Sequence, residues 1–389
     1  MDNFEWVSIV SSTRKTVLVP RGFFPVLAGA AWCAALAWLL FTWSGHYPID
    51  LDVYRLGGLA WLEGRSLYTG FTGPPLDPRL PFTYPPAAAV LFSALSFVPS
   101  PLLFPLMVVS GFVALTVVCV AVAGKVNPRL TWTAGLLVPV GALALDPVWM
   151  TYGYGQINLY LLALVVLDVL LVTDRRWRGV LIGVAAAVKL TPAIFVLYFL
   201  ARRDWRAAGT SAATFLGLAV AGFLAAPTDS SQYWLHSLLN PDRIGDMSLA
   251  TNQSIRGVLR GFGLAPGFET LLWVAFAGLA VLTAWLVARR TRDDLVALFV
   301  IAAAGLLASP VSWLHHWVWC VPVLVFLVLR RHFWLAGAVF LVFVTRLHEF
   351  DTYVWLTAIT VGGLAFRQET RPSVRPTTPS VVARPATTP

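Results

Sequence analysis

Long apolar runs alternate with short polar connections along most of the chain. The first run, Gly22 to Trp43, contains no charged residue and has about the length, roughly 17–25 residues, that a helix needs to cross a bilayer. The apolar segments lie at approximately 22–43, 102–124, 131–145, 157–173, 179–189, 190–201, 207–226, 270–288, 294–308, 314–329, 332–345 and 353–366. The pattern predicts an all-α, polytopic membrane protein with about twelve transmembrane helices and outer-face loops that contain short amphipathic helices.

Two apolar segments fit this scheme less simply. Residues 85–100 are a short segment that begins with Pro85-Pro86 and ends at Pro99-Ser100-Pro101, so we expect a re-entrant or interfacial segment rather than a span. Residues 179–201 have basic residues at both ends, which favours two short helices that turn at Lys189-Leu190-Thr191-Pro192. A single long span is the alternative for this second segment.

Basic residues gather in clusters between the apolar segments. Since cytoplasmic loops of membrane proteins are enriched in Lys and Arg, we expect the clusters on the cytoplasmic side. They are Arg14/Lys15/Arg21, Lys125/Arg129, Arg175/Arg176/Arg178, Arg202/Arg203/Arg206, Arg289/Arg290/Arg292 and Arg330/Arg331. The connections left outside are residues 44–82, 146–156, 227–269, 309–313 and 346–352. Both termini are then cytoplasmic, as a segment 1–21 and a Pro-, Thr- and Arg-rich disordered tail 367–389 around a membrane domain 22–366.

Composition agrees with a membrane protein and excludes some other classes. The 389 residues are 58% hydrophobic and 12% charged, whereas a soluble domain carries about a quarter charged residues. The net charge of +9 does not indicate nucleic-acid binding, because most basic residues lie between apolar segments and in the tail. Cys33, Cys119 and Cys320 lie far apart in apolar segments, so we assign them to packing. No internal repeat is visible, which argues against a transporter or flippase built from repeated halves.

The outer connections hold nearly all non-basic polar residues, and the first contains Tyr47-Pro48-Ile49-Asp50-Leu51-Asp52-Val53-Tyr54-Arg55. An enzyme that removes a proton from a hydroxyl needs a base at such a place, whereas a membrane anchor does not. On a helix Asp50 and Asp52 diverge by about 200°, so that only one faces a substrate. We choose Asp50 as the base, with Asp52 orienting it or pairing with Arg55. A solvated loop with a helix-capping acid is the alternative.

Polar groups follow at two further outer positions. Residues 57–64 are expected to form a short amphipathic helix, and Phe82-Thr83-Tyr84-Pro85-Pro86 a stiff corner that shapes a pocket wall. Gln156 and Asn158 stand at an outer helix start, where their amides suit sugar hydroxyls; helix capping and hydrogen bonding between membrane helices are the alternative.

Lys189 lies within an apolar run. An intramembrane lysine costs at least ~2.5 kcal/mol at the bilayer centre, so we expect it to face a polar cavity or an anion. The helix start after Pro192 also favours an anion. Together, the lysine and the helix start suggest a binding site for a lipid phosphate. The alternative is a lysine whose long side chain reaches the membrane interface.

Ser309-Pro310-Val311-Ser312-Trp313-Leu314-His315-His316-Trp317 is the second strong candidate. Adjacent histidines on a helix point about 100° apart and suit a metal poorly, so we predict no metal site. His315 or His316 would contact a phosphate or an acceptor, and Trp313 would stack on a sugar; a buried histidine bonded to a neighbouring helix is the alternative. In the loop 227–269, Asn252-Gln253-Ser254 is expected to cap a short helix. Its residues Arg256 and Arg260 would receive an anionic head group or rest on lipid phosphates.

Five of these motifs, in the same order, resemble glycosyltransferase family 87. They are Asp50-Leu51-x-Val53-Tyr54 with Gly57 nearby, Phe82-x-Tyr84-Pro85-Pro86, Gly155-Gln156-x-Asn158, Lys189-Leu190-Thr191-Pro192 and Ser312-Trp313-x-His315-His316. The resemblance implies a membrane-embedded GT-C fold and transfer of mannose from polyprenyl-phosphate-mannose, in α-1,2 linkage, to phosphatidylinositol mannosides, lipomannan or lipoarabinomannan. It also implies that the acid at Asp50 is the catalytic base.

The predicted site therefore lies on the outer face of the plasma membrane. Nucleotide sugars are not expected there, which favours a lipid-phosphate sugar as donor. The resemblance implies that the acceptor is a phosphatidylinositol mannoside, and we expect no cofactor. The predicted catalytic residues are Asp50, Asp52, His315 and His316, and the predicted substrate contacts are Tyr54, Arg55, Tyr84, Gln156, Asn158, Lys189, Asn252, Arg256 and Trp313. Lipomannan or lipoarabinomannan as acceptor, and more distantly a lipid-linked sugar flippase, are the alternatives.

Overall fold

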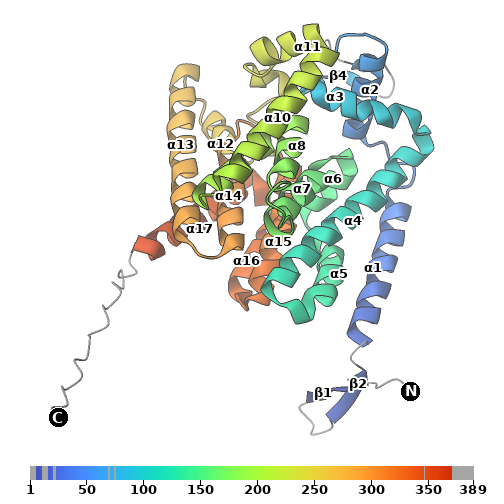
Figure 1. The fold of residues 1–389 in the computed structure, drawn as a ribbon, viewed down its shortest axis with the longest axis vertical. Coiled ribbons are helices and arrows are strands. Elements are labelled where there is room, and N and C mark those ends of the chain that lie inside the picture. The colour runs from blue at the N-terminus through green and yellow to red at the C-terminus, as the bar shows by residue number, and fades with distance from the viewer. Residues whose placement is uncertain are drawn as a thin grey trace, which may run out of the picture.

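The computed structural model describes residues 6–10, 16–20, 23–68, 71–73, 76–345 and 347–369. Most of this part of the chain is helical, as the apolar pattern predicts (Figure 1). Two short antiparallel ribbons depart from the all-α prediction: β1 (Trp6–Val10) pairs with β2 (Thr16–Pro20), and β3 (Phe71–Gly73) with β4 (Leu76–Leu80). Of the predicted disordered tail, residues 370–389 lie outside the described residues, and 367–369 continue the last helix.

Every predicted span is helical over most of its length. The helices are α1 (Phe23–Thr42), α4 (Ser100–Val126), α5 (Thr131–Ala142), α7 (Asn158–Leu170), α8 (Val180–Val188), η3 with α9 (Thr191–Phe195, Val196–Ala201), α10 (Trp205–Ala225), α13 (Pro266–Arg290), α14 (Asp294–Ala308), η6 with α15 (Leu314–Trp319, Cys320–Leu329), α16 (Phe333–Val344) and α17 (Thr352–Glu369). In the described chain four helices are long and apolar enough to cross a membrane, namely Phe24–Thr42, Ser100–Val126, Trp205–Ala225 and Pro266–Arg290. A fifth is added if Pro128–Ala142 and Asp146–Tyr154, which are bent by 73°, form one span. The other predicted spans are apolar helices of 10–17 residues or shorter.

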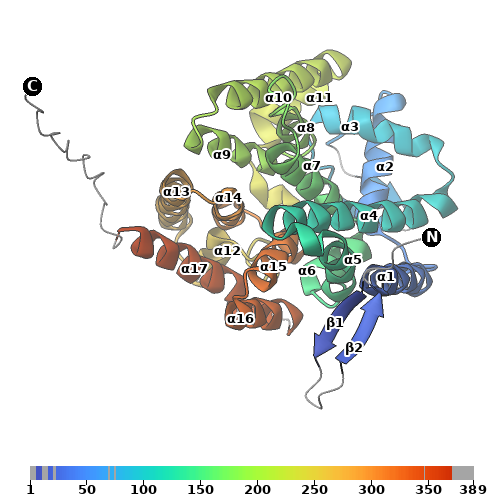
Figure 2. The ribbon, with the colours of Figure 1, turned by 60° about the horizontal axis from the view of Figure 1, so that its bottom comes forward.

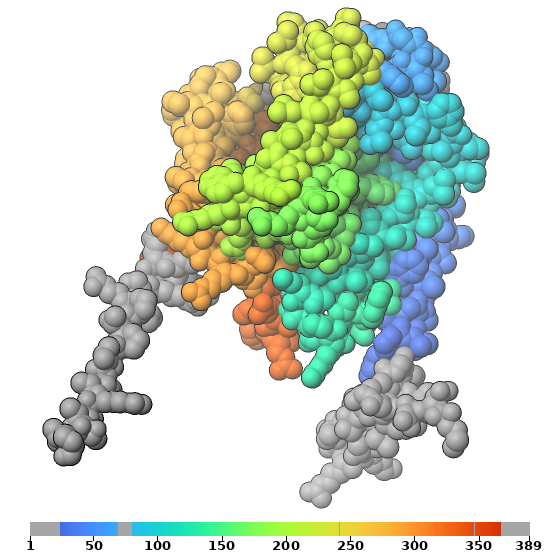
Figure 3. Space-filling model, viewed as in Figure 1, coloured from blue at the N-terminus to red at the C-terminus, as the bar shows by residue number. Residues whose placement is uncertain are grey.

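The outer faces of the long helices are apolar. Only 22% of the hydrophobic window of α10, and the same share of α13, is buried inside the protein. Leu216 and Val220 on α10, and Leu271 on α13, are more than half exposed. Soluble proteins rarely leave such continuous apolar faces uncovered. In the space-filling view α10 and α13 form part of the visible surface, and we assign these faces to contact with lipid (Figure 3).

Three short helices lie together at one end of the molecule. In Figure 1, α2 (Ile49–Leu62), α3 (Pro86–Phe92) and α11 (Pro227–Gln232) lie at the top, where α10 ends. The predicted amphipathic helix at 57–64 therefore begins earlier, at Ile49, because Pro48 and the acids that follow it form its first turn. The segment 85–100 forms α3 and the 3-10 helix η1 (Ser93–Phe97), which pack against α2.

The chain breaks at Lys189, as predicted for two short helices rather than one long span. Helix α8 ends at Val188, Lys189 is extended (φ −143°, ψ 125°), and η3 begins at Thr191 with Pro192 in its first turn. The start of α8 is fixed by the buried Asp168, whose carboxylate accepts hydrogen bonds from Gly179 N and Ile182 N at 2.7 and 2.8 Å. Because both ends of α8 are fixed, the lysine side chain has a defined position.

The core lies between the central helices α4, α7, α8, α14 and α15, which appear close together in Figure 2. Fully buried aliphatic residues such as Leu115, Leu162, Ile301 and Val325 fill this region. Asn158, the first residue of α7, is buried at the edge of this apolar core, next to the polar side chains described below.

Candidate active site

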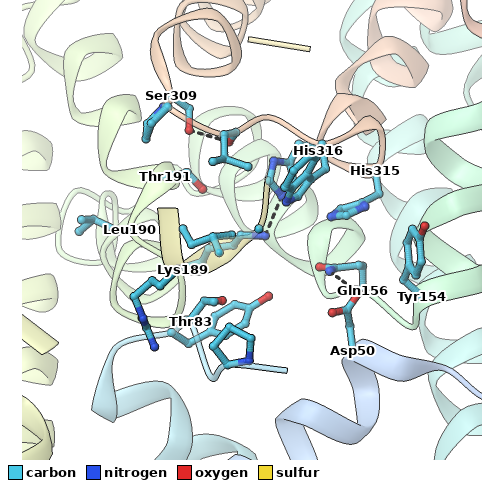
Figure 4. Close-up of a pocket in the computed structure, with 18 of the residues that line it drawn as sticks. Asp50, Thr83, Tyr154, Gln156, Lys189, Leu190, Thr191, Ser309, His315 and His316 are labelled. Carbon is cyan, nitrogen blue, oxygen red and sulfur yellow. Dashed lines mark hydrogen bonds between the residues drawn. The ribbon is translucent and has the colours of Figure 1, made fainter. Parts of the chain in front are cut away.

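A cavity of about 840 Å³ lies where the predicted outer connections meet the ends of the central helices. Its lining comes from the start of α2, residues 80–85, the turn between α6 (Asp146–Tyr154) and α7, the break at 189–194, the loop 233–251 and residues 305–316. The volume is in the range of 300–1,000 Å³ that is usual for ligand pockets. Figure 4 shows the polar part, in which Asp50, Gln156, Lys189, His315 and His316 surround one space.

Asp50 lies in the first turn of α2 and lines the cavity. Asp52 is in the same turn but points elsewhere: its carboxylate accepts a hydrogen bond from Tyr47 Oη and lies 3.8 Å from Arg55 Nη1. The helical geometry therefore separates the two acids, as expected if the segment is a helix. Asp52 and Arg55 were predicted at the site, yet neither lines the cavity.

Gln156 holds the carboxylate of Asp50. Its Nε2 donates to Asp50 Oδ2 at 2.7 Å, and its Oε1 accepts from Tyr54 Oη at 2.9 Å. Because that bond uses the only hydroxyl proton of Tyr54, Tyr84 Oη donates to Tyr54 Oη across 3.0 Å. Tyr84 and Gln156 line the cavity, whereas Tyr54 stands behind them, fully buried. Tyr54 thus positions Gln156 rather than contacting a ligand.

A glycine turn brings Gln156 to this position. Gly155 ends α6 in the left-handed conformation (φ 68°), and a Cβ there would lie 2.7 Å from Pro48 Cβ and 2.8 Å from Leu51 Cβ. Only glycine allows both the turn and this close approach to the start of α2. The turn at Gly155 therefore places the Gln156 side chain where it can donate its hydrogen bond to Asp50.

The environment of Asp50 changes its acidity. Burial disfavours the ionised form and raises the pKa of Asp50 to about 6, although the hydrogen bond from Gln156 and the positive charge of Lys189 oppose this rise. Helix α2 is outside the candidate membrane spans. A carboxylate with a pKa near 6 is largely ionised at neutral pH and accepts a proton more readily than an ordinary aspartate.

Lys189 enters the same space from the break after α8. Its Nζ donates to Asn158 Oδ1 at 3.1 Å and, since an ammonium has no acceptor, donates to His316 Nε2 at 3.2 Å. It also lies 5.6 Å from the centre of the Tyr84 ring. Within the described residues, no carboxylate lies within ion-pair distance of Lys189. Its charge is therefore available to an anionic ligand.

His315 has a different environment from His316. Both its ring nitrogens are buried and have no hydrogen-bond partner in the described structure, and the ring lies edge-on to Tyr154 with centroids 5.5 Å apart. The main chain is fixed, because Asn158 Nδ2 donates to His315 O at 2.9 Å. Asn158 lines a small neighbouring cavity and positions both Lys189 and His315. An orphaned, cavity-lining imidazole is suited to a ligand hydroxyl or phosphate.

The loop that contains Asn252 is tied to the histidine segment. Ser312 N donates to Asn252 Oδ1 at 2.9 Å, Gln253 N donates to Ser312 O at 2.9 Å, and Asn252 forms an isolated β-bridge with Trp313. Trp313 lines the cavity, whereas Asn252 is 1% exposed and does not. The predicted contact at Asn252 is thus a structural link that fixes Trp313.

Ser254 caps α12 (Ile255–Gly261), as predicted, by accepting a hydrogen bond from Gly257 N. Arg256 lies outside the cavity: its Nε is 3.0 Å from Glu269 Oε1, and Arg260 Nε is 3.2 Å from Glu269 Oε2. Glu269 is 1% exposed. Arg256 and Arg260, which were predicted to receive an anionic head group, are therefore paired with a carboxylate of the protein itself.

The polar lining residues that sequence reasoning missed include Tyr154, Tyr233, Arg243 and Asp246. The sequence does not distinguish Arg243 from the other arginines of the predicted outer connections, such as Arg55, Arg65, Arg256 and Arg260. Among the described residues, no three His, Cys, Asp or Glu side chains group as a metal site requires.

Comparison with known proteins gives the family. Residues 82–310 match the model of Glycosyltransferase family 87. The chain is 39% identical over 373 residues to the polyprenol-phosphate-mannose-dependent alpha-(1-2)-phosphatidylinositol mannoside mannosyltransferase of Mycolicibacterium smegmatis, with 87% of this chain and 78% of that protein covered. It is 41% identical over 321 residues to the protein of the same name from Mycobacterium tuberculosis, covering 76% and 73%.

A third relative is named for a different acceptor, a phosphatidylinositol pentamannoside. The polyprenol-phosphate-mannose-dependent alpha-(1-2)-phosphatidylinositol pentamannoside mannosyltransferase of Mycolicibacterium smegmatis is 34% identical over 315 residues, which cover 78% of this chain and 75% of that protein. No solved structure matches the chain. The family match and the identities confirm the resemblance seen in the five motifs: the chain belongs to glycosyltransferase family 87.

Proposed function

We propose that this enzyme transfers mannose from polyprenyl-phosphate-mannose to a phosphatidylinositol mannoside and forms an α-1,2 linkage. The family and the names of the relatives support both substrates. The observation that carries the proposal is that an oriented carboxylate, Asp50, and a lysine without a carboxylate partner, Lys189, line one cavity. Transfer of a sugar from a phosphate needs both a base for the acceptor and a cation for the leaving group.

We further propose a GT-C fold with about twelve membrane helices, both termini in the cytoplasm, and the cavity open toward the outer face of the plasma membrane. Support comes from the one-sided distribution of basic clusters and from the position of the cavity among the predicted outer connections. A lipid-linked donor is then expected to enter from the bilayer, with its chain against the apolar lining at Leu190, Ile194 and Ala308.

In the proposed reaction Asp50 is the general base. Its Oδ2 is held by Gln156, and Oδ1 has no hydrogen bond with a described residue, so that Oδ1 is free to accept the proton of an acceptor hydroxyl. The acceptor oxygen forms a bond to the anomeric carbon as the bond from that carbon to the phosphate oxygen breaks. The bonding electrons leave with polyprenyl phosphate, and the proton passes through Asp50 to solvent. A single displacement converts a β-linked donor into an α product.

Lys189 stabilises the departing phosphate. Asn158 and His316 hold its ammonium group at 3.1 and 3.2 Å, which orients it before the substrate arrives. His315 supplies the one buried ring of the described lining whose nitrogens lack partners, and we assign it to a sugar hydroxyl or to a phosphate oxygen. Trp313, fixed through Asn252, offers an apolar face to a sugar ring.

The test is mannose transfer by the purified enzyme in detergent or proteoliposomes. Asp50→Asn keeps the size of the side chain and should lower kcat by about 10²–10⁴-fold, the usual contribution of a general base. Asp52→Asn is the matched control, because it changes an acid of the same helical turn outside the cavity, and should leave kcat within about threefold. Near-normal turnover of Asp50→Asn, with the donor shown to be consumed, would exclude the mechanism.

A further inference from the structure

Arg243 is the cation of the cavity lining that the mechanism leaves without a role. It belongs to the 3-10 helix η5 (Pro241–Ile244) in the loop after α11, and it is half-buried. One nitrogen, Nη2, donates to Phe82 O at 2.9 Å, and the guanidinium group lies 5.3 Å from the centre of the Tyr68 ring. These two contacts fix the group, and neither Nε nor Nη1 has a hydrogen bond to a described residue.

The other arginines of the predicted outer connections are neutralised wherever the structure describes their side chains. Arg55 pairs with Asp52, Arg65 with Glu63, Arg256 with Glu269, and Arg260 with Asp242 and Glu269. Arg243 has no carboxylate within ion-pair distance among the described residues. Asp246 lies three residues further on, but its Oδ1 accepts from Ser248 N and Oγ at 2.9 and 2.6 Å.

Arg243 and Lys189 are separated by aromatic residues. Lys189 Nζ lies over the ring of Tyr84, whereas Arg243 lies over the ring of Tyr68. Tyr68 Oη donates to Tyr84 O at 2.9 Å, and Phe82 packs between them with ring centroids 6.2 and 5.7 Å from the two tyrosines. The cavity therefore presents two unneutralised cations at two distinct positions on either side of this aromatic group.

The proposed reaction brings two phosphodiesters to one cavity. The donor phosphate leaves from the face of the anomeric carbon opposite to the attacking hydroxyl, so the acceptor lies on the other side of the reacting centre. Two phosphodiesters beside a single cation would repel each other strongly in a cavity of low dielectric constant. A second cation removes this repulsion, and a guanidinium group with two free N–H donors matches the two oxygens of a phosphodiester.

We propose that Arg243 binds the phosphodiester of the lipid acceptor and thereby selects a mannoside linked to a phospholipid over a neutral one. The inference rests on the proposed function and goes one step beyond it, because it assigns the anionic part of the acceptor to a residue outside the catalytic group. Lys189, next to Asn158 and His316, remains the site of the donor phosphate.

The test compares two acceptors with the reconstituted enzyme: a phosphatidylinositol mannoside and an alkyl mannoside without phosphate. Arg243→Gln should raise the KM for the phosphatidylinositol mannoside by about 10- to 100-fold, the usual loss for a hydrogen-bonded ion pair. The KM for the alkyl mannoside and for polyprenyl-phosphate-mannose should stay within about twofold. Arg243→Lys keeps the charge and should recover part of the loss. Arg65→Gln is the control. It removes an arginine that does not line the cavity, and it should leave the KM values for both acceptors and for the donor unchanged.

Binding measured without turnover separates this inference from the proposed function. Phosphatidylinositol mannoside should stabilise the wild-type protein against thermal unfolding in detergent, and Arg243→Gln should remove most of that shift. A higher KM for the donor alone would assign Arg243 to the leaving phosphate and overturn the proposal. Equal losses with both acceptors would show that Arg243 only supports Phe82 and Tyr68. Wild-type protein that binds the acceptor but transfers no mannose would refute the proposed function and leave the phosphate site supported.

Discussion

Removing the hydrogen bond between Gln156 and Asp50 should move the pH dependence of the enzyme. Gln156→Met keeps an unbranched side chain of similar length but cannot donate to Asp50 Oδ2. The bond stabilises the ionised carboxylate and so holds the pKa of Asp50 below the value that burial alone would give. Without it the protonated form is favoured, and the pKa of Asp50 rises. Since a general base acts only when ionised, activity will be lost at a higher pH as the solution is acidified.

The size of the effect follows from the charge on Asp50. A hydrogen bond to an ionised group contributes about 1.5–3 kcal/mol, and 1.36 kcal/mol corresponds to one pKa unit. The acid limb of the kcat/KM profile should therefore move upward by about 1–2 pH units, from the wild-type position set by a pKa of about 6. At pH 6.5 a rise of about 1.5 units lowers the ionised fraction roughly eightfold. At pH 9 the variant should approach the wild-type rate.

The assay is kcat/KM for mannose transfer between pH 5 and pH 9 at saturating second substrate. Tyr54→Phe is the matched control, because it removes the bond to Gln156 Oε1 but leaves the bond from Gln156 to Asp50. Its acid limb should move by less than half as much. An acid limb that stays at the wild-type pH in Gln156→Met would refute the assignment of the limb to Asp50. A uniform loss at every pH would show that Gln156 acts through substrate binding instead.

Three other substitutions test the remaining parts of the site. Lys189→Met should lower kcat by about 10²–10³-fold in single-turnover transfer, because the leaving phosphate loses its cation, and a normal rate would exclude that role. Gly155→Ala should lower the free energy of unfolding by about 1–3 kcal/mol, because alanine is strained in the left-handed conformation of this turn. Gly141→Ala is the control, since a Cβ at this helical position would meet no neighbouring atom within 4 Å. Equal unfolding temperatures of the two variants would show that the turn does not require glycine. Glu269→Gln should lower the free energy of unfolding by about 3–5 kcal/mol, because it leaves the buried Arg256 without a charge partner. An unchanged unfolding temperature would show that this ion pair does not stabilise the protein.

The helices of this fold are predictable from local sequence, and the reason is visible at particular residues. Apolar runs end at polar or proline-containing breaks, so the predicted limits fall within a few residues of α1, α10 and α13. The break at Lys189 was predictable as well, because a charged residue followed by proline interrupts an apolar run. Helical geometry predicted that only one of Asp50 and Asp52 would face the site, and Asp50 is the one that lines the cavity.

The predictions that placed Asn252 and Arg256 at the substrate depended on information that local sequence does not contain. Asn252 bonds to Ser312, which is 60 residues away, and Arg256 to Glu269, which is 13 residues away on another helix. A polar residue in an outer loop has the same appearance in the sequence whether it meets a ligand or another part of the chain. The difference depends on which residue the polar side chain contacts in the folded protein, and the local sequence does not give that contact.

We infer that charge neutralisation within the protein is a better guide to ligand-binding cations than position along the chain. A buried or half-buried cation that already has a carboxylate partner gains little from a further anion, because its desolvation is compensated. A cation of the cavity lining without such a partner keeps that uncompensated cost until an anionic ligand arrives. Lys189 and Arg243 meet this condition among the described lining residues, whereas Arg256 lies outside the cavity and is paired with Glu269. The same criterion assigns one cation to each of the two phosphodiesters that a lipid-to-lipid sugar transfer must bring together.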